Sequence, residues 1–193
     1  MARAPLIIVS GPSGSGKSTL IKGVMARWPG RLELAVSATT RQPRPNEEEG
    51  RDYYFWKPER FRQAIDVGEF LEYACVHGNN YYGTPRSEVE PRLERGVGVF
   101  LDVDVQGADK IRPLYPEHLS VFVRLPALWV YCQRLEVERR ESPENIVRRL
   151  GTAINELAQI GKYQAVIVNE DREVATAELE RLVRERFPGW LPD

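Results

Sequence analysis

The sequence predicts an α/β fold with a largely parallel central sheet. Short apolar runs that fit β-strands alternate along the chain with stretches whose apolar residues recur at helical spacing. One run, residues 97–103, is apolar except for Gly98 and Asp102, which is typical of a strand buried on both faces. The length of 193 residues allows one domain, with room for small inserted lobes.

Composition and charge exclude several classes of protein. Apolar residues make up 42% and charged residues 28% of the chain, which is ordinary for a globular protein and unlike a disordered one. The 27 basic and 28 acidic residues nearly cancel, so we expect no nucleic-acid partner. The apolar run at residues 6–9 is far shorter than the roughly 20 residues that span a bilayer, and no signal peptide is visible. Together with only two cysteines, these features predict a cytoplasmic protein without a membrane partner, whose state as monomer or homo-oligomer stays open.

Turn and breaker residues bound the predicted elements. Predicted strands cover residues 6–9, 34–37, short aromatic-rich pieces of 69–84, 97–103, 120–125 and 165–168. Predicted helices cover about 17–27, 58–67, 87–95, 142–160 and 173–187. Pro29 ends the first helix, Pro58 begins the second, and Ser142 with Pro143 supplies a cap and a first turn for the fourth. Residues 33–95 therefore interrupt the sheet as an inserted lobe.

A glycine-rich loop, residues 11–18, separates the first strand from the first helix. It reads GPSGSGKS and matches the phosphate-loop pattern G-x-x-x-x-G-K-[ST]. Glycines allow backbone N–H groups to surround phosphate oxygens, and the following helix directs its positive end at the anion. Lys17 would reach the β- and γ-phosphates, and Ser18 would coordinate Mg²⁺. The predicted set of residues that bind a nucleoside triphosphate here is Gly11, Ser13, Gly14, Ser15, Gly16, Lys17, Ser18 and Thr19.

Two arginines and two tyrosines lie further along, within the inserted lobe. Arg41 and Arg44 stand three residues apart on a proline-stiffened segment, and Tyr53 and Tyr82 follow in aromatic-rich stretches. Guanidinium groups bind phosphate oxygens in pairs and phenols donate single hydrogen bonds, so these residues would form a clamp for a monophosphate. Taken alone, the two arginines fit a solvated basic loop equally well.

Five motifs taken together resemble those of guanylate kinases and run in the same order over nearly the whole chain. They are VSATTRQPR at 36–44, GRDYYF at 50–55, GEFLE at 68–72, YYGT at 81–84 and DVDVQG at 102–107. The resemblance implies a P-loop NTPase three-layer fold with a mostly parallel central sheet, an inserted mixed-β lobe that binds GMP, and a helical lid. It implies a single domain whose parts are a core of 1–32, 96–130 and 150–193, a lobe of about 33–95 and a lid of about 131–149.

The resemblance also implies roles for individual residues. The GMP phosphate would be held by Arg41, Arg44, Tyr53 and Tyr82, and Glu72 would accept hydrogen bonds from two donors of guanine. Further contacts with GMP would come from Ser37, Thr84, Asp102, Asp104 and Arg149. Asp102 would stand with Ser18 near Mg²⁺, and Arg134 and Asn169 would contact ATP. The residues expected to promote the transfer are Lys17, Arg41, Arg134 and Arg149.

Purely structural roles are also open for some of these residues. Asp102 and Asp104 would serve as caps at the end of a strand, and the arginines of the lid would belong to a salt-bridged helix surface. The lid also departs from the family pattern Arg-Leu-x-Gly-Arg-Gly, because Glu138 replaces the second arginine and both glycines are missing. Residues 78–82 contain one asparagine more than the common pattern.

These features predict transfer of the γ-phosphoryl group of MgATP to GMP, giving GDP and ADP, as a step of purine nucleotide metabolism. Two alternatives stand beside this prediction. A related kinase would act on another phosphorylated acceptor such as a ribose bisphosphate, against which Glu72 and Thr84 argue. An inactive protein-binding module of the same family usually has a damaged phosphate loop, whereas the loop here is intact.

Overall fold

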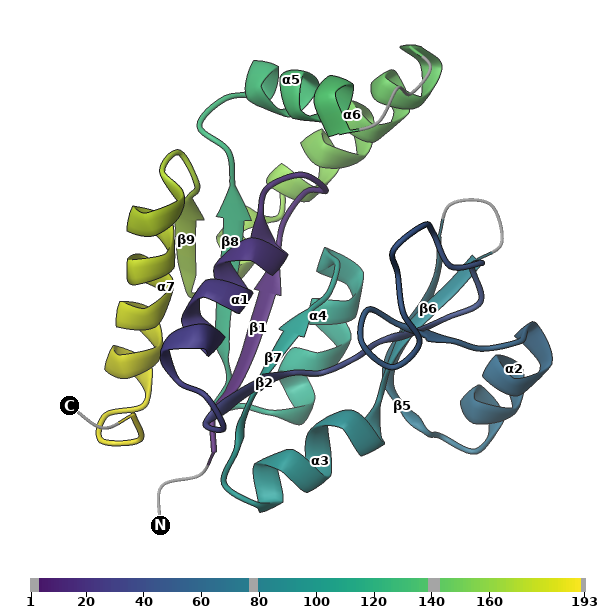
Figure 1. The fold of residues 1–193 in the computed structure, drawn as a ribbon, viewed down its shortest axis with the longest axis vertical. Coiled ribbons are helices and arrows are strands. Elements are labelled where there is room, and N and C mark those ends of the chain that lie inside the picture. Colours follow the sequence, from purple (N-terminus) through teal and green to yellow (C-terminus); the bar gives the residue numbers. More distant parts are fainter. Residues whose placement is uncertain (1–3, 77–79, 139–142, 192–193) are drawn as a thin grey trace.

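The computed structural model describes residues 4–76, 80–138 and 143–191. In that part of the chain, a five-stranded sheet has the order β2-β7-β1-β8-β9, and every neighbouring pair is parallel (Figure 1). Its strands are β1 (Leu6–Ser10), β2 (Leu32–Leu34), β7 (Gly98–Asp102), β8 (Leu119–Arg124) and β9 (Ala165–Val168). The predicted parallel sheet is therefore confirmed.

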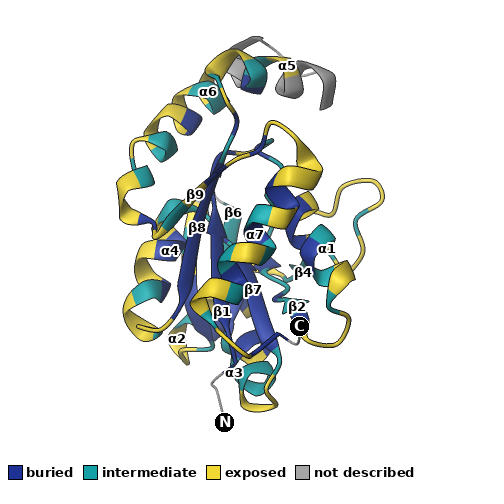
Figure 2. Cartoon of the chain, turned by 90° about the vertical axis from the view of Figure 1, so that its left-hand side faces the viewer, coloured by how far each residue is buried: buried dark blue, intermediate teal, exposed yellow. Residues whose placement is uncertain are grey.

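Helices cover both faces of this sheet and form the outer layers of a three-layer fold (Figures 1 and 2). Helices α1 (Lys17–Arg27) and α7 (Arg172–Arg186) lie against one face, whereas α3 (Arg86–Glu94) and α4 (Val105–Ile111) lie against the other. Side chains of β1 alternate between the two faces, so that Ile7 and Val9 pack with the first pair and Leu6 and Ile8 with the second. Figure 2 shows the strands as a buried layer between more exposed helices.

A second sheet projects beside the central one and carries α2 (Pro58–Asp66) (Figure 1). In the described residues its order is β4-β3-β6-β5, with β3 and β4 parallel and the other pairs antiparallel. Its strands are β3 (Ala38–Thr39), β4 (Tyr54–Phe55), β5 (Phe70–Val76) and β6 (Asn80–Pro85). Phe61 of α2 is fully buried and stacks on Phe70, with the two ring centroids 4.4 Å apart. This sheet therefore has a small apolar core of its own.

Two helices, α5 (Leu128–Glu138) and α6 (Pro143–Leu157), follow β8 and lie beyond the carboxyl ends of the central strands (Figure 1). The described side chains of this pair end at Gln133 and resume at Val147. Two short 3₁₀ turns, η1 (Arg112–Leu114) and η2 (Ile160–Lys162), complete the described elements. Among the described helices, none has the length and the apolar character that would let it cross a membrane.

The strand predicted at residues 34–37 is wrong. β2 ends at Leu34, and the backbone N–H of Ala35 still donates to the carbonyl of Phe100 at 3.0 Å. The chain then crosses to the second sheet, where β3 begins at Ala38. Ala35 is buried at this crossing, so the short apolar run reflects a buried connection between two sheets and not one strand.

The structure also corrects the helices that the sequence predicts. No pattern in the sequence predicts α4, because this helix is short and Gly107 interrupts its apolar residues. Asp104 caps it, since its side chain accepts from the backbone N–H of Gly107 at 2.7 Å. The helix predicted to run to about residue 160 ends at Leu157, and η2 follows as a separate turn.

The stacked pair in the second sheet yields a stability prediction. Replacing Phe61 by alanine removes a buried ring and leaves a cavity, so we expect Phe61→Ala to lower the free energy of unfolding by about 3 kcal/mol. Urea denaturation followed by circular dichroism measures this change. The control is Val67→Ala at the end of the same helix, where the side chain is 70% exposed and the expected loss is below about 0.5 kcal/mol. Equal losses in the two variants would contradict the assigned core.

Candidate functional site

The glycine-rich loop connects β1 to α1 at the carboxyl edge of the central sheet. Gly11 adopts a φ of 139°, and a Cβ atom at this position would lie 2.0 Å from the carbonyl oxygen of Val123. Only glycine fits there, because any side chain would overlap the backbone of β8. The backbone N–H of Ser15 donates to the carbonyl of Pro12 at 3.0 Å, which closes the turn. The loop is thus held close to the sheet by backbone contacts.

Lys17 and Ser18 begin α1 and face the end of β7. The ammonium of Lys17 donates to the carbonyl of Gly11 at 2.7 Å and lies 3.8 Å from Asp102 Oδ1. The hydroxyl of Ser18 donates to Asp102 Oδ2 at 2.9 Å. These contacts arise because β1 and β7 are parallel neighbours with Val9 opposite Asp102, so both strands end at one edge. The structure therefore brings together the three residues that the sequence places at the triphosphate and metal site.

The donor atoms of this group suit a magnesium ion. Mg²⁺ prefers oxygen ligands and usually takes only one or two from protein, while water and phosphate oxygens supply the others. The Ser18 hydroxyl and the Asp102 carboxylate are such oxygens, and they already lie in contact. In the described ranges, no cluster of three or more His, Cys, Asp or Glu side chains could hold a metal ion. Two protein oxygens are a number that Mg²⁺ takes when water and phosphate oxygens supply its other ligands.

Two adjoining cavities lie along this edge of the sheet. The loop cavity, of about 660 Å³, is lined by most residues of the glycine-rich loop and by Thr19, Asp102 and Glu47. The lobe cavity, of about 640 Å³, lies between the second sheet and the core and is lined by residues that include Arg41, Arg44, Tyr53, Glu72 and Tyr82. The residues that line both cavities are Ser13, Ser37, Tyr53, Asp102, Val103, Asp104 and Glu156. The two spaces are therefore neighbours with a shared wall.

Glu72 is the buried carboxyl group of the lobe cavity, with only 7% of the residue exposed. It follows a register shift in β5 and accepts a hydrogen bond from the hydroxyl of Thr84, its partner on β6, at 2.8 Å. Burial raises the pKa of Glu72 to about 7, the charge of Asp104 adds to the rise, and the bond from Thr84 opposes it. A Cβ atom on Gly107 would lie 3.0 Å from Glu72 Oε2, so a glycine in α4 leaves room for this carboxyl group.

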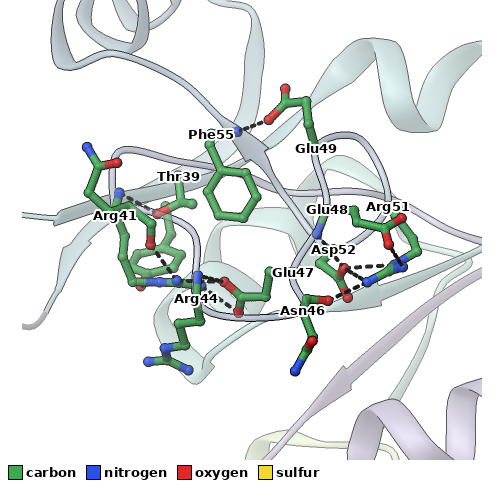
Figure 3. A network of polar contacts seen from close by, with 12 residues as sticks. Thr39, Arg41, Arg44, Asn46, Glu47, Glu48, Glu49, Arg51, Asp52 and Phe55 are labelled. Atoms are coloured by element: carbon green, nitrogen blue, oxygen red, sulfur yellow. Dashed lines mark hydrogen bonds and ion pairs between the residues drawn. The ribbon is translucent and has the colours of Figure 1, made fainter.

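Arg41, Tyr53 and Tyr82 gather at another part of the lobe cavity. Arg41 Nε donates to the hydroxyl of Tyr82 at 3.1 Å, and its guanidinium carbon lies 5.3 Å from the centre of the Tyr53 ring. Burial raises the pKa of Tyr53 to about 12, so its hydroxyl stays a hydrogen-bond donor at neutral pH. Arg41 also pairs with Glu47, which holds the pKa of that carboxyl below its usual value (Figure 3). The side chain of Arg41 is only 14% exposed, which does not fit a freely solvated basic loop.

Helix α6 covers the cavities with a polar stripe. Arg149 Nη2 donates to the hydroxyl of Ser13 at 2.5 Å, which joins this helix to the glycine-rich loop. The stripe continues into the lobe cavity with Thr152, Asn155 and Glu156, and Gln159, just after the helix, lines the same cavity. Burial raises the pKa of Glu156 to about 7, with Lys17 opposing and Asp104 adding to the rise. Glu156 lies seven residues after Arg149, on the same helical face, a spacing that could have identified it from sequence.

Other predicted site residues have structural contacts or lie outside the described part of the chain. The amide of Asn169 donates to the carbonyl of Ser15 at 2.7 Å, and both residues are buried behind the loop without lining either cavity. Asp104 lines both cavities and caps α4 as well. The side chains of Arg134 and Glu138 lie outside the described part of the chain, as do residues 77–79, Arg139 and Arg140. Their roles, and the effect of the altered lid and of the added asparagine, stay predictions.

A glycine-rich loop after the first strand of a parallel sheet, with an acid at the end of the neighbouring strand, defines a P-loop NTPase. A family model for guanylate kinase matches residues 3–186. The guanylate kinase of Rubrobacter xylanophilus is 45% identical to this chain over 192 residues, and the match covers 100% of both proteins. That of Gloeobacter violaceus is 44% identical over 183 residues, which cover 95% of this chain and 88% of the relative.

A solved structure gives the same result. The crystal structure of guanylate kinase from Anaplasma phagocytophilum superposes with a TM-score of 0.77 at 31% identity, covering 97% of this chain and 88% of that one. The chain therefore belongs to the guanylate kinase family.

The buried carboxyl group yields a prediction about stability and pH. The folded chain binds the Glu72 proton more tightly than the unfolded chain, because burial raises the pKa from 4.5 to about 7. Glu72 therefore lowers the stability of the fold as the pH rises through this window. Glu72→Gln keeps the shape and an acceptor for Thr84 but cannot ionise. The free energy of unfolding of this variant, relative to that of the wild type, should therefore rise between pH 4.5 and 7, by at most about 3 kcal/mol. Urea titrations of both proteins at several pH values measure the difference, and a difference that does not change with pH would contradict the assigned burial.

Proposed function

We propose that this chain catalyses the transfer of the γ-phosphoryl group of ATP to GMP, giving GDP and ADP. The observation that carries the proposal is the pair of adjoining cavities, one built on the glycine-rich loop and the other containing the buried Glu72. Membership of the guanylate kinase family supports the same reaction. The donor and the acceptor phosphates would meet at the wall that the cavities share, near Asp102 and Arg149.

Glu72 would select guanine in the lobe cavity. An ionised carboxylate accepts two hydrogen bonds, and guanine presents a ring N–H and an amino group side by side, whereas adenine has no such pair of donors. A buried acceptor that a wrong ligand leaves unpaired is costly, so this arrangement rejects AMP strongly. Thr84, which donates to Glu72, together with Ser37 and Asp104 would complete the surroundings of the base.

Cationic groups and hydrogen-bond donors in both cavities would hold the phosphates. Backbone N–H groups of the glycine-rich loop and Lys17 would bind the triphosphate, while Arg41, Arg44, Tyr53 and Tyr82 would bind the phosphate of GMP. Arg149 would neutralise charge between them from α6. The phosphate of GMP is already an anion and needs no strong base, so catalysis consists of positioning and charge neutralisation. Arg134 would contribute from the lid.

Ser18 and Asp102 would hold magnesium together with the phosphates of ATP. When bound, Mg²⁺ neutralises charge on the β- and γ-phosphates. The residues of the chain then align the two nucleotides and exclude water, which prevents hydrolysis of ATP. In this proposal residues 33–95 act as the lobe that binds GMP, residues 131–149 as the lid, and the remainder as the core. We also propose the cytoplasm as the compartment, where both nucleotides occur.

A coupled assay of ADP release tests the reaction and the acceptor. With MgATP we expect turnover with GMP, and at least about a hundredfold lower kcat/KM with AMP, UMP or CMP, because Glu72 would be left unpaired. The control without any acceptor measures hydrolysis of ATP. Binding of GMP without turnover would contradict the catalytic proposal and indicate a binding module. Absence of GMP binding would contradict the role of Glu72.

A further inference from the structure

Arg41 is held by a carboxylate that no role in the reaction has used so far. Glu47 Oε2 accepts from Arg41 Nη1 at 2.8 Å, and Glu47 Oε1 accepts from Nη2 at 3.0 Å (Figure 3). The two side chains are only 14% and 19% exposed. A paired contact of this kind fixes the plane of the guanidinium group as well as its position.

The backbone around Glu47 is shaped to make this contact. Asn46 has a φ of 71°, and it is the only residue other than glycine with a positive φ in the described ranges. This left-handed turn, which asparagine tolerates better than most residues, directs Glu47 back toward the arginines. Glu47 Oε2 also accepts from the backbone N–H of Arg44 at 2.7 Å. One carboxylate therefore connects the side chain of Arg41 with the backbone of Arg44.

Glu47 makes these contacts from the side of the arginine that faces the loop cavity. Arg41 and Tyr82 line the lobe cavity, Tyr53 lines both cavities, and Glu47 lines the loop cavity. The carboxylate occupies Nη1 and Nη2 of Arg41, and the Nε edge is directed to Tyr82, which belongs to the lobe cavity. Arg41 Nη1 also donates to the backbone carbonyl of Gln42 at 2.8 Å, so the guanidinium group is held by Glu47, Gln42 and Tyr82 before any ligand binds.

We propose that Glu47 is a positioning residue, which holds Arg41 and the backbone of Arg44 in place for the phosphate of GMP before GMP binds. The inference rests on the proposed function, because the anion that Arg41 would bind is the phosphate of GMP. A free arginine side chain loses much conformational freedom when it binds an anion, and a side chain that is already ordered loses less. Glu47 carries out no chemistry itself.

Two effects of Glu47 on GMP affinity have opposite signs. Its negative charge repels the phosphate, so a purely electrostatic role predicts tighter binding of GMP when the charge is removed. Ordering of Arg41 predicts weaker binding when the contact is lost. The direction of the change therefore decides between the two roles.

The experiment compares three variants in the coupled assay and by calorimetry. We expect Glu47→Ala to raise the KM for GMP about tenfold, with a much smaller change in kcat, because the ordered clamp is lost. Glu47→Gln keeps one acceptor oxygen and should show a smaller rise, of about threefold. The control is Glu48→Gln, which removes a charge one residue further on. Glu48 pairs with Arg51 and its side chain is 66% exposed. The KM of the Glu48→Gln variant for GMP should therefore stay close to that of the wild type.

A phosphate-specific readout separates positioning from damage to the lobe. Calorimetry without ATP should show that Glu47→Ala weakens binding of GMP but leaves binding of guanosine unchanged, because guanosine lacks the phosphate. Equal weakening of both ligands, an unchanged KM in both Glu47 variants, or a lower KM in either would overturn the inference. Failure of the proposed function would look different, since the wild-type chain itself would then show no turnover of GMP.

Discussion

The parallel pairing of β1 with β7 is the constraint on which the site depends. With Val9 opposite Asp102, the glycine-rich loop leaves β1 at the edge where β7 ends in its carboxylate, and Ser18 contacts that carboxylate at 2.9 Å. An antiparallel pairing would place Asp102 at the opposite edge of the sheet. The second sheet and α6 approach the same edge, and Arg149 joins α6 to the loop. One strand pairing therefore decides that the residues we propose for the phosphate donor and for the phosphate acceptor line adjoining cavities.

Carboxyl groups in these cavities have different environments, which shift their pKa values in opposite directions. Glu72 and Glu156 are both removed from solvent, and burial raises the pKa of each to about 7. Both groups therefore hold a proton more tightly than an exposed carboxyl group does, and a hydrogen-bond donor to the charged form opposes this effect. Glu47 is the opposite case, because the contact with Arg41 lowers its pKa and keeps it charged. The two cavities thus contain acids whose pKa shifts depend on burial and on the partner of each group.

The sequence predicts correctly those helices and strands whose ends are set by residues close by in the chain. The helix at Lys17–Arg27 and the strand at Ala165–Val168 lie where the sequence places them, because glycine, proline and apolar runs bound them. The crossing between the two sheets at residues 35–37 was misread as a strand, since an apolar run does not show which sheet it joins. The contact of Glu47 with Arg41 depends on a left-handed turn at Asn46, and the position of Glu156 depends on where α6 lies over the sheet. Both are matters of tertiary structure: the spacing places Glu156 on the same helical face as Arg149, but it does not show where that face lies over the sheet.

In the proposed reaction, one chain holds the donor and the acceptor nucleotide at the same time, with their phosphates adjacent. Calorimetry with a dinucleotide in which a polyphosphate chain joins adenosine to guanosine measures whether both cavities are filled at once. The adjoining cavities predict that one molecule binds per chain, more tightly than either nucleotide alone, and that both ATP and GMP displace it competitively. Displacement by only one of the two nucleotides, or binding of two molecules per chain, would show that the two cavities do not hold the two nucleotides together.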